Sequence, residues 1–194
     1  MKKFLPFLIL VFLITLTGVS IYNLNSQQAK ATSPKLDKSD NEVKSDNEIN
    51  IHFSEVNIKL PDFSLPNLYE QNKTFSKKDL IGHYSIINIF ASWCTTCRAE
   101  HNILLRLQGE KIIDVYGIAW RDIDDNTKYF LRKNGNPFDV VATDSKAVFS
   151  KLINLNSVPE TLITDPKGNV VMRYRGNLQE FSIDEIKKFL RSRN

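Results

Sequence analysis

Two cysteines, the only ones in the 194-residue chain, lie three positions apart at Cys94 and Cys97. An isolated CxxC pair is typical of a redox-active dithiol or of half a metal site, whereas a disulfide-stapled domain needs several spaced cysteines. A zinc site takes four ligands, and the chain offers only three histidines besides, of which His101 is nearest. The spacing therefore favours dithiol–disulfide exchange over metal binding. Haem attachment through CxxCH is excluded, because Arg98 follows the second cysteine.

The flanking segments place this pair at the junction of a strand and a helix. Residues 84–90 form a compact apolar run, and residues 98–107 carry apolar side chains at helical spacing. Cys94 should therefore lie at a helix N-terminus, where free backbone N–H groups and the helix dipole lower a thiol pKa. We expect Cys94 to attack a substrate disulfide and Cys97, one turn later on the same face, to resolve the mixed disulfide.

The N-terminal residues predict the compartment in which this chemistry occurs. Residues 4–22 carry no charge and follow Lys2 and Lys3 in a short cytoplasmic N-terminus, residues 1–3. At about 1.5 Å per residue this stretch comes close to the ~30 Å hydrocarbon core of a bilayer, with the lysines on the cytoplasmic side. A cleaved signal peptide is the alternative, but its candidate site at 29–31 lies far beyond the apolar run. Either way the domain works where disulfides form.

The remaining chain divides into a linker and one domain. Residues 23–52 are polar and charged, with Lys-Ser-Asp-Asn-Glu at both 38–42 and 44–48, so they predict a disordered, flexible linker. Residues 53–194 are long enough for a single core. The net charge is +4 without any basic block interleaved with aromatics, so nucleic-acid binding has no support.

Hydrophobic periodicity predicts strands and helices in alternation along this domain. We expect a short extended pair at 61–66 and 73–75, strands at 84–90, 112–119 and 138–142, helices at 98–107, 125–133 and 147–153, and a hairpin of 161–164 with 170–174. A capping box at 182–185 should open the last helix. This order predicts an α/β domain with a mixed central sheet covered on both faces.

The run from Trp93 to His101, WCTTCRAEH, resembles the active site of the thioredoxin superfamily. More narrowly, it is similar to that of the membrane-anchored thiol:disulfide interchange proteins of cytochrome c maturation, the DsbE/CcmG type, which show WCPTCRAEH. Further matches are Gly135–Pro137, Val158–Thr161, and Gly168-Asn169 followed by Arg173–Gly176. The resemblance covers roughly residues 60 to 190.

This resemblance implies a thioredoxin-like three-layer sandwich with an added N-terminal β-hairpin. Pro159 would be a cis-proline beside the dithiol that, with Val158, offers backbone groups to a substrate strand, and Glu160 would tune the cysteines. Asn88 stands where ordinary thioredoxins place a buried proton-accepting aspartate, so Glu160, water or the substrate would take that role. The other implied substrate-binding and tuning residues are Trp93, Thr95 and Thr96.

The resemblance also implies a substrate and partners. The protein would be a single-pass inner-membrane protein with its catalytic domain in the periplasm. Its substrate would be a disulfide, either in the CxxCH site of an apocytochrome c or in a cytochrome c maturation carrier protein. A membrane electron donor of the DsbD/CcdA type would reduce the Cys94–Cys97 disulfide back to the dithiol. No cofactor is expected besides this redox-active disulfide. Two alternatives are a general periplasmic disulfide oxidase or isomerase and a copper or zinc chaperone using Cys94, Cys97 and His101.

The chain departs from the family pattern at three positions near the implied site. Thr95 replaces the usual proline of the CxxC motif, while Asn154 and Ser157 replace glycines five and two residues before Pro159. We expect the first change to affect the redox potential and the other two to reshape the groove that admits the partner.

Overall fold

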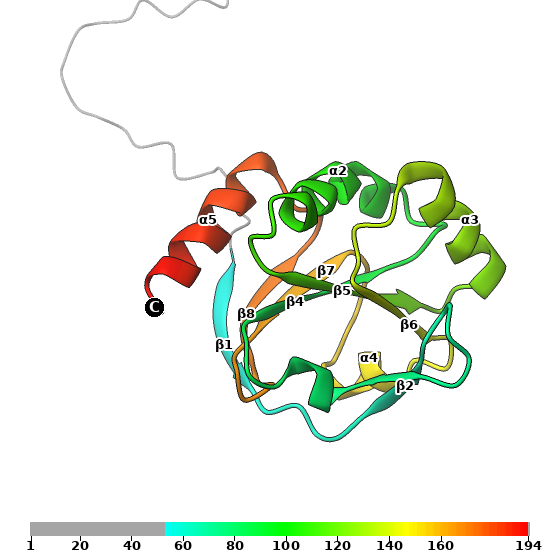
Figure 1. Ribbon diagram of the computed structural model, residues 1–194, viewed down its shortest axis with the longest axis horizontal. Coiled ribbons are helices and arrows are strands. Elements are labelled where there is room, and N and C mark those ends of the chain that lie inside the picture. Colours follow the sequence, from blue (N-terminus) through cyan, green and yellow to red (C-terminus); the bar gives the residue numbers. More distant parts are fainter. Residues whose placement is uncertain (1–52, 194) are drawn as a thin grey trace, which may run out of the picture. The chain divides into compact units, whose positions relative to one another are not determined.

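The central element is a six-stranded mixed sheet, seen in a computed structural model that describes residues 53–193 (Figure 1). Its strands are β1 (Ser54–Ile58), β4 (Ser85–Phe90), β5 (Asp114–Trp120), β6 (Val140–Asp144), β7 (Glu160–Thr164) and β8 (Val170–Arg175). They lie in the order β1-β8-β7-β4-β5-β6. Strands β4, β5 and β6 are parallel, whereas β7, β8 and β1 pair antiparallel. The predicted mixed sheet is confirmed.

Strand β4 lies in the middle of this sheet and leads directly to the cysteines. All six of its residues are buried, because layers of side chains cover both faces. A strand buried on both faces has a continuous apolar sequence rather than an alternating one, which explains the run that predicted it. The chain leaves the carboxyl end of β4 at Phe90 and reaches Cys94 four residues later.

One face of the sheet carries the three longer helices. These are α2 (Thr95–Gly109), α3 (Asp124–Asn134) and α5 (Glu180–Arg191), which Figure 1 shows together on one side. Leu104 and Leu107 of α2, Leu131 of α3 and Ile186 of α5 are almost fully buried in the core on this side. At about 25 cal/mol per Å² of buried apolar surface, side chains of this size each contribute roughly 1.5–3 kcal/mol to holding the helices on the sheet.

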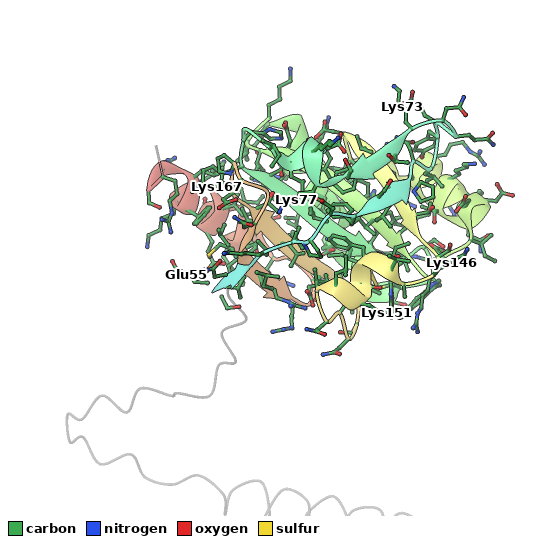
Figure 2. The ribbon with its side chains drawn as sticks, turned by 90° about the horizontal axis from the view of Figure 1, so that it is seen from below. Glu55, Lys73, Lys77, Lys146, Lys151 and Lys167 are labelled. Atoms are coloured by element: carbon green, nitrogen blue, oxygen red, sulfur yellow. A yellow bond between two sulfur atoms is a disulfide. The ribbon has the colours of Figure 1, made fainter. Side chains whose placement is uncertain are left out.

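The opposite face is covered by shorter elements: β2 (Ser64–Pro66), β3 (Thr74–Ser76), η1 (Lys77–Leu80) and α4 (Val148–Leu152). Strands β2 and β3 form the added antiparallel hairpin, and Leu65 and Phe75 from it pack into the second core beside Phe149 of α4. Figure 2 shows this layer from below, with lysines such as Lys73 and Lys151 around its edge. The predicted three-layer arrangement is confirmed.

Three local expectations were wrong or incomplete. The last helix begins at Glu180, not after Ser182; Ser182 is buried and its hydroxyl accepts a hydrogen bond from the Gln179 backbone N–H at 3.1 Å. Strand β1 was not expected; it is a short edge strand in which only Val56 and Ile58 are partly buried. Strand β6 begins two residues later than predicted. The ring of Phe138 lies against Gly117, where a Cβ would approach it to 2.7 Å, so Phe138 fills the core instead of opening the strand.

The predicted membrane anchor at 4–22 and the linker at 23–52 lie outside the described residues. Among the helices of residues 53–193, none is both long and apolar enough to cross a membrane.

Candidate functional site

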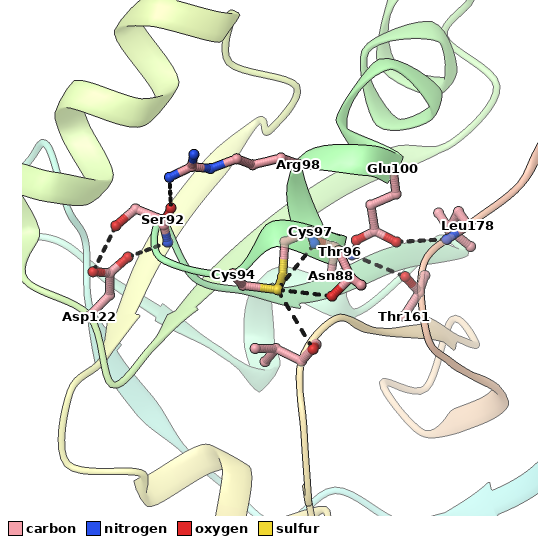
Figure 3. The surroundings of a disulfide bond; sticks show 11 residues. Asn88, Ser92, Cys94, Thr96, Cys97, Arg98, Glu100, Asp122, Thr161 and Leu178 are labelled. Carbon is pink, nitrogen blue, oxygen red and sulfur yellow. Dashed lines mark hydrogen bonds between the residues drawn. A yellow bond between two sulfur atoms is a disulfide. The ribbon is translucent and has the colours of Figure 1, made fainter. Parts of the chain in front are cut away.

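The two sulfurs lie at the start of α2, where the sequence predicted them. Cys94 is the N-cap residue and is disulfide-bonded to Cys97 (Figure 3). The Cys97 backbone N–H donates to the Cys94 sulfur at 3.1 Å, and the Thr96 hydroxyl lies 3.3 Å from the same sulfur. Both donors converge on Cys94, at the positive end of the helix dipole. A negative charge is therefore better stabilised at Cys94 than at Cys97.

The loop before β7 borders the first sulfur. The Val158–Pro159 peptide bond is cis, as predicted, and the Val158 carbonyl oxygen lies 3.7 Å from the Cys94 sulfur. This loop therefore leaves backbone groups beside the dithiol, where an extended chain can pair with them. Trp93 lies on the surface next to Cys94 with 55% of its side chain exposed, and its indole N–H donates to the Arg121 carbonyl at 3.3 Å.

A buried aspartate fixes the segment that carries Trp93. The Asp122 carboxylate accepts hydrogen bonds from the Ser92 backbone N–H at 2.6 Å and from the Ser92 hydroxyl at 3.0 Å. It also accepts from the Thr127 hydroxyl at 2.9 Å in α3. These bonds tie the residues before Cys94 to α3. The Cys94 sulfur is thus positioned by the Asp122 hydrogen bonds before it and by helix α2 after it.

Glu100, the glutamate of the CRAEH motif, is completely buried one turn after Cys97 on the inner face of α2. The Asn88 side-chain amide donates to one carboxylate oxygen at 2.8 Å, and the Leu178 backbone N–H donates to the other at 2.8 Å (Figure 3). Burial raises the pKa of Glu100 to about 7, although both hydrogen bonds oppose this shift. This carboxyl group can therefore gain or lose a proton near neutral pH.

Glu100 is a candidate functional residue that the sequence analysis missed. Its signal was its position: a glutamate three residues after Cys97 on a predicted helix shares the face of that cysteine. Asn88, at the position of the proton-accepting aspartate of thioredoxins, holds the Glu100 carboxyl group instead of accepting the proton itself. In this chain the buried carboxyl group at this place belongs to helix α2, and its hydrogen-bond partner Asn88 belongs to strand β4.

Glu160 lies on the other face of the sheet. Side chains alternate along a strand, and in the β4–β7 pair Asn88 lies opposite Thr161, whereas Ile89 lies opposite Glu160. The Asn88 amide bonds to the Thr161 hydroxyl on the α2 face, while Ile89 belongs to the opposite core. Glu160 therefore points away from the sulfurs.

Glu160 is paired with arginines on that opposite face. Its carboxylate lies 2.6 Å from an Arg173 guanidinium nitrogen, and both side chains are buried. Burial raises the pKa of Glu160, and the charges of Arg173 and Arg175 oppose this shift. Its expected tuning of the cysteines is not supported by direct contact and stays a prediction.

Arg173 also holds the loop that contains the cis-proline. Its guanidinium donates to the Ile153 carbonyl at 2.8 Å and to the Asn154 carbonyl at 3.3 Å. Asn154 has φ +51°, in the left-handed region that glycine and asparagine tolerate best. The glycine usual at this position in the family is therefore replaced by the side chain best able to keep the same turn. Thr95 and Ser157, the other departures, are exposed.

His101 faces α3 rather than the cysteines. Its Nε2 lies 3.0 Å from the Gly135 carbonyl oxygen, to which it donates, and its ring packs edge-on against Phe130. Burial lowers the pKa of His101, which favours the neutral ring. Across residues 53–193, no three His, Cys, Asp or Glu side chains come together as metal ligands would. This arrangement does not favour the metal-chaperone alternative.

A dithiol at a helix N-terminus, beside a cis-proline and above a mixed sheet, defines the class of thioredoxin-like thiol:disulfide oxidoreductases. The sequence matches the Redoxin family over residues 55–190. It is 30% identical over 155 residues to the thiol:disulfide interchange protein DsbE of Allochromatium vinosum, covering 80% of this chain and 75% of that protein. Its identity to DsbE of Haemophilus influenzae is 34% over 126 residues, covering 64% of this chain and 68% of the other.

A solved structure shares the fold. A Chlorobium tepidum protein ascribed to the DsbE thiol:disulfide interchange proteins superposes with a TM-score of 0.62 at 21% identity, covering 73% of this chain and 99% of that one. The chain belongs to the Redoxin family and, within it, to the thiol:disulfide interchange proteins of the DsbE type.

Proposed function

We propose that this protein reduces a disulfide in the CxxCH haem-binding site of an apocytochrome c, or in a carrier that handles it, in the periplasm. The observation that carries the chemistry is the convergence of the Cys97 N–H and the Thr96 hydroxyl on the Cys94 sulfur. The match to DsbE proteins supports the class of reaction. The substrate follows from the resemblance to interchange proteins of cytochrome c maturation.

The first step is attack by Cys94. In the reduced protein its thiolate, held by these two donors, attacks one sulfur of the substrate disulfide. A Cys94–substrate bond forms, the substrate S–S bond breaks, and the second substrate sulfur leaves as a thiolate that takes up a proton. The backbone beside Val158 holds the substrate strand while this occurs.

The second step is resolution by Cys97. Its thiol gives its proton to the ionised Glu100 carboxylate, and the Cys97 thiolate attacks the Cys94 sulfur. The Cys94–Cys97 disulfide forms and the remaining substrate sulfur leaves as a thiolate, so two electrons pass from the protein to the substrate. Glu100 suits this role because its raised pKa, about 7, lies near the working pH.

The oxidised protein must then be reduced again. We infer that a membrane electron donor of the DsbD/CcdA type does this, and that residues 4–22 anchor the protein in the inner membrane with residues 23–52 as the linker. An oxidising compartment drives such a dithiol toward the disulfide unless electrons are supplied. A membrane anchor would keep the domain close to the electron donor that reduces its disulfide.

Trapping the mixed disulfide tests the proposal. In a full-length Cys97→Ala variant the Cys94–substrate bond cannot be resolved, so a covalent adduct with a c-type apocytochrome or its carrier should accumulate. The matched Cys94→Ala variant should give none, because only the stabilised sulfur attacks. Absence of any adduct on Cys97→Ala would refute the exchange mechanism. An adduct exclusively with other proteins would refute the proposal that the substrate is an apocytochrome c or its carrier.

The direction of electron flow separates this function from that of a general disulfide oxidase. Equilibration of the Cys94–Cys97 pair with glutathione measures its reduction potential. We expect a potential below that of the glutathione pool, as a reductant requires. A potential well above it would favour the oxidase.

A further inference from the structure

A cavity of about 370 Å³ opens between the segment that carries the dithiol and helix α3. Trp93 and Arg98 line it from the dithiol side, and Tyr129, Phe130 and Lys133 line it from α3. None of the proposed steps of disulfide exchange uses this cavity. We name it the α3 cavity.

Large exposed aromatic side chains form part of its wall. Trp93 is 55% exposed and Tyr129 is 56% exposed, whereas Phe130 is buried and belongs to the core. Exposed tryptophan and tyrosine are enriched where proteins bind partners, because they bury much surface at a small entropic cost. The wall therefore has the composition of a recognition site.

The charged groups of the α3 cavity all have one sign. Arg98 and Lys133 are its only charged lining residues in the described chain, and both are cations. The guanidinium of Arg98 donates to the Ser92 carbonyl at 2.7 Å and lies 6.0 Å from the centre of the Phe130 ring. Arginine carries five N–H donors, so this contact leaves donors for a ligand.

Nearby acidic groups do not neutralise these cations from within the cavity. The Asp122 carboxylate is buried and accepts hydrogen bonds from Ser92, Ile123 and Thr127. Asp124 and Asp125 lie in the first turn of α3 but do not line the cavity. The site therefore suits an anionic ligand.

We propose that the α3 cavity binds an acidic side chain of the partner polypeptide, a few residues from the cysteine that joins Cys94. This inference rests on the proposed exchange reaction and adds the class of sequence that it selects. Ser92 and Trp93 immediately precede Cys94, and an extended chain advances about 3.3 Å per residue, so a nearby residue of a bound partner can reach the cavity. A carboxylate there meets Arg98 and Lys133, and the aromatic wall shields the pair from water.

The test measures how fast Cys94 forms a mixed disulfide with defined peptides. The full-length Cys97→Ala protein reacts with a peptide whose single cysteine carries thionitrobenzoate. The peptide sulfur bonds to Cys94 and the coloured thionitrobenzoate thiolate leaves, so absorbance reports the rate. The peptides are identical except for glutamate or lysine placed two, three or four residues to either side of the cysteine.

We expect the glutamate peptide to react about fivefold or more faster than the lysine peptide at one of these spacings, the effect of one or two partly screened ion pairs. Lys133→Glu should abolish or invert that ratio. The matched control is Lys167→Glu, which makes the same change in net charge on the exposed β7–β8 turn seen in Figure 2. The control should keep the ratio within about twofold of the starting protein.

Two results would overturn the inference. One is a ratio near one at every spacing, and the other is an equal change of the ratio in Lys133→Glu and Lys167→Glu. Both leave the exchange reaction intact, because the peptides still react. Failure of every peptide to react would instead refute attack by Cys94, and with it both the proposed function and the α3 cavity as a subsite.

Discussion

Two buried glutamates lie on opposite faces of the same sheet, and they differ in what surrounds them. Glu100 and Glu160 are 0% and 2% exposed, so both side chains are buried. Glu100 accepts hydrogen bonds from two neutral groups, the Asn88 amide and the Leu178 N–H. Glu160 lies 2.6 Å from the Arg173 guanidinium, with Arg175 nearby.

Because of this difference, the two carboxyl groups are suited to different roles. Burial raises the pKa of both, but only at Glu160 do neighbouring positive charges oppose the shift and bind the ionised form. Glu100, with a pKa of about 7 and no such neighbour among its hydrogen-bond partners, is suited to move a proton. Glu160 is suited to hold Arg173, and through it the loop that contains Pro159. Burial alone did not decide either role; the charge of the partner did.

The largest effect should come from breaking the ion pair. Arg173→Met leaves the Glu160 carboxyl group buried without its cation and frees the carbonyls of Ile153 and Asn154. We expect the free energy of unfolding to fall by about 3–5 kcal/mol, measured by urea denaturation of the oxidised protein. The Glu160→Leu/Arg173→Met double variant should recover part of this loss. A loss under about 1 kcal/mol in the single variant would show that the pair is not the structural element described.

The second effect is a pH dependence of stability that belongs to Glu100. Its pKa is raised from 4.5 to about 7 in the folded protein. Between these values the folded protein keeps a proton that the unfolded chain has lost, so stability is greatest below the lower value and falls as pH rises toward the upper one. The loss is about 1.4 kcal/mol per pH unit, or roughly 3 kcal/mol in all.

Glu100→Gln should remove this dependence, because glutamine imitates the protonated carboxyl group. Denaturation of both oxidised proteins at several values between pH 5 and pH 8 gives the comparison. As pH rises, the free energy of unfolding of the variant should increase relative to that of the original protein. Parallel stability curves for the two proteins would contradict the raised pKa.

The smallest effect concerns the turn that Arg173 holds. Asn154→Ala places a side chain that disfavours the left-handed conformation at φ +51°, so we expect a loss of about 1 kcal/mol. Asn154→Gly should be close to neutral, because glycine adopts this conformation freely. A difference between the two variants in thermal unfolding confirms the turn, whereas equal stabilities would contradict it.

Much of this architecture was predictable because it depends on local patterns. The apolar run of β4 and the helical spacing after Cys97 predicted the strand-to-helix junction, and the residues around Pro159 predicted the cis bond through family resemblance. The surroundings of Glu160 were not predictable. Which face of a sheet Glu160 occupies depends on the register of β4 and β7, and what neutralises it depends on Arg173 from another strand.

The most direct test of the account is the pH dependence of the resolving step. A substrate mixed disulfide on Cys94 is formed in a single turnover, and the release of substrate is followed between pH 5 and pH 9 in the original protein, Glu100→Gln and Glu160→Gln. We expect the original rate to rise through an apparent pKa near 7, set by Glu100. Glu100→Gln should lose this inflection and resolve about a hundredfold more slowly, the scale of general base catalysis, while Glu160→Gln should retain it. An unchanged inflection in Glu100→Gln, or its loss in Glu160→Gln, would contradict the assignment of the proton to Glu100.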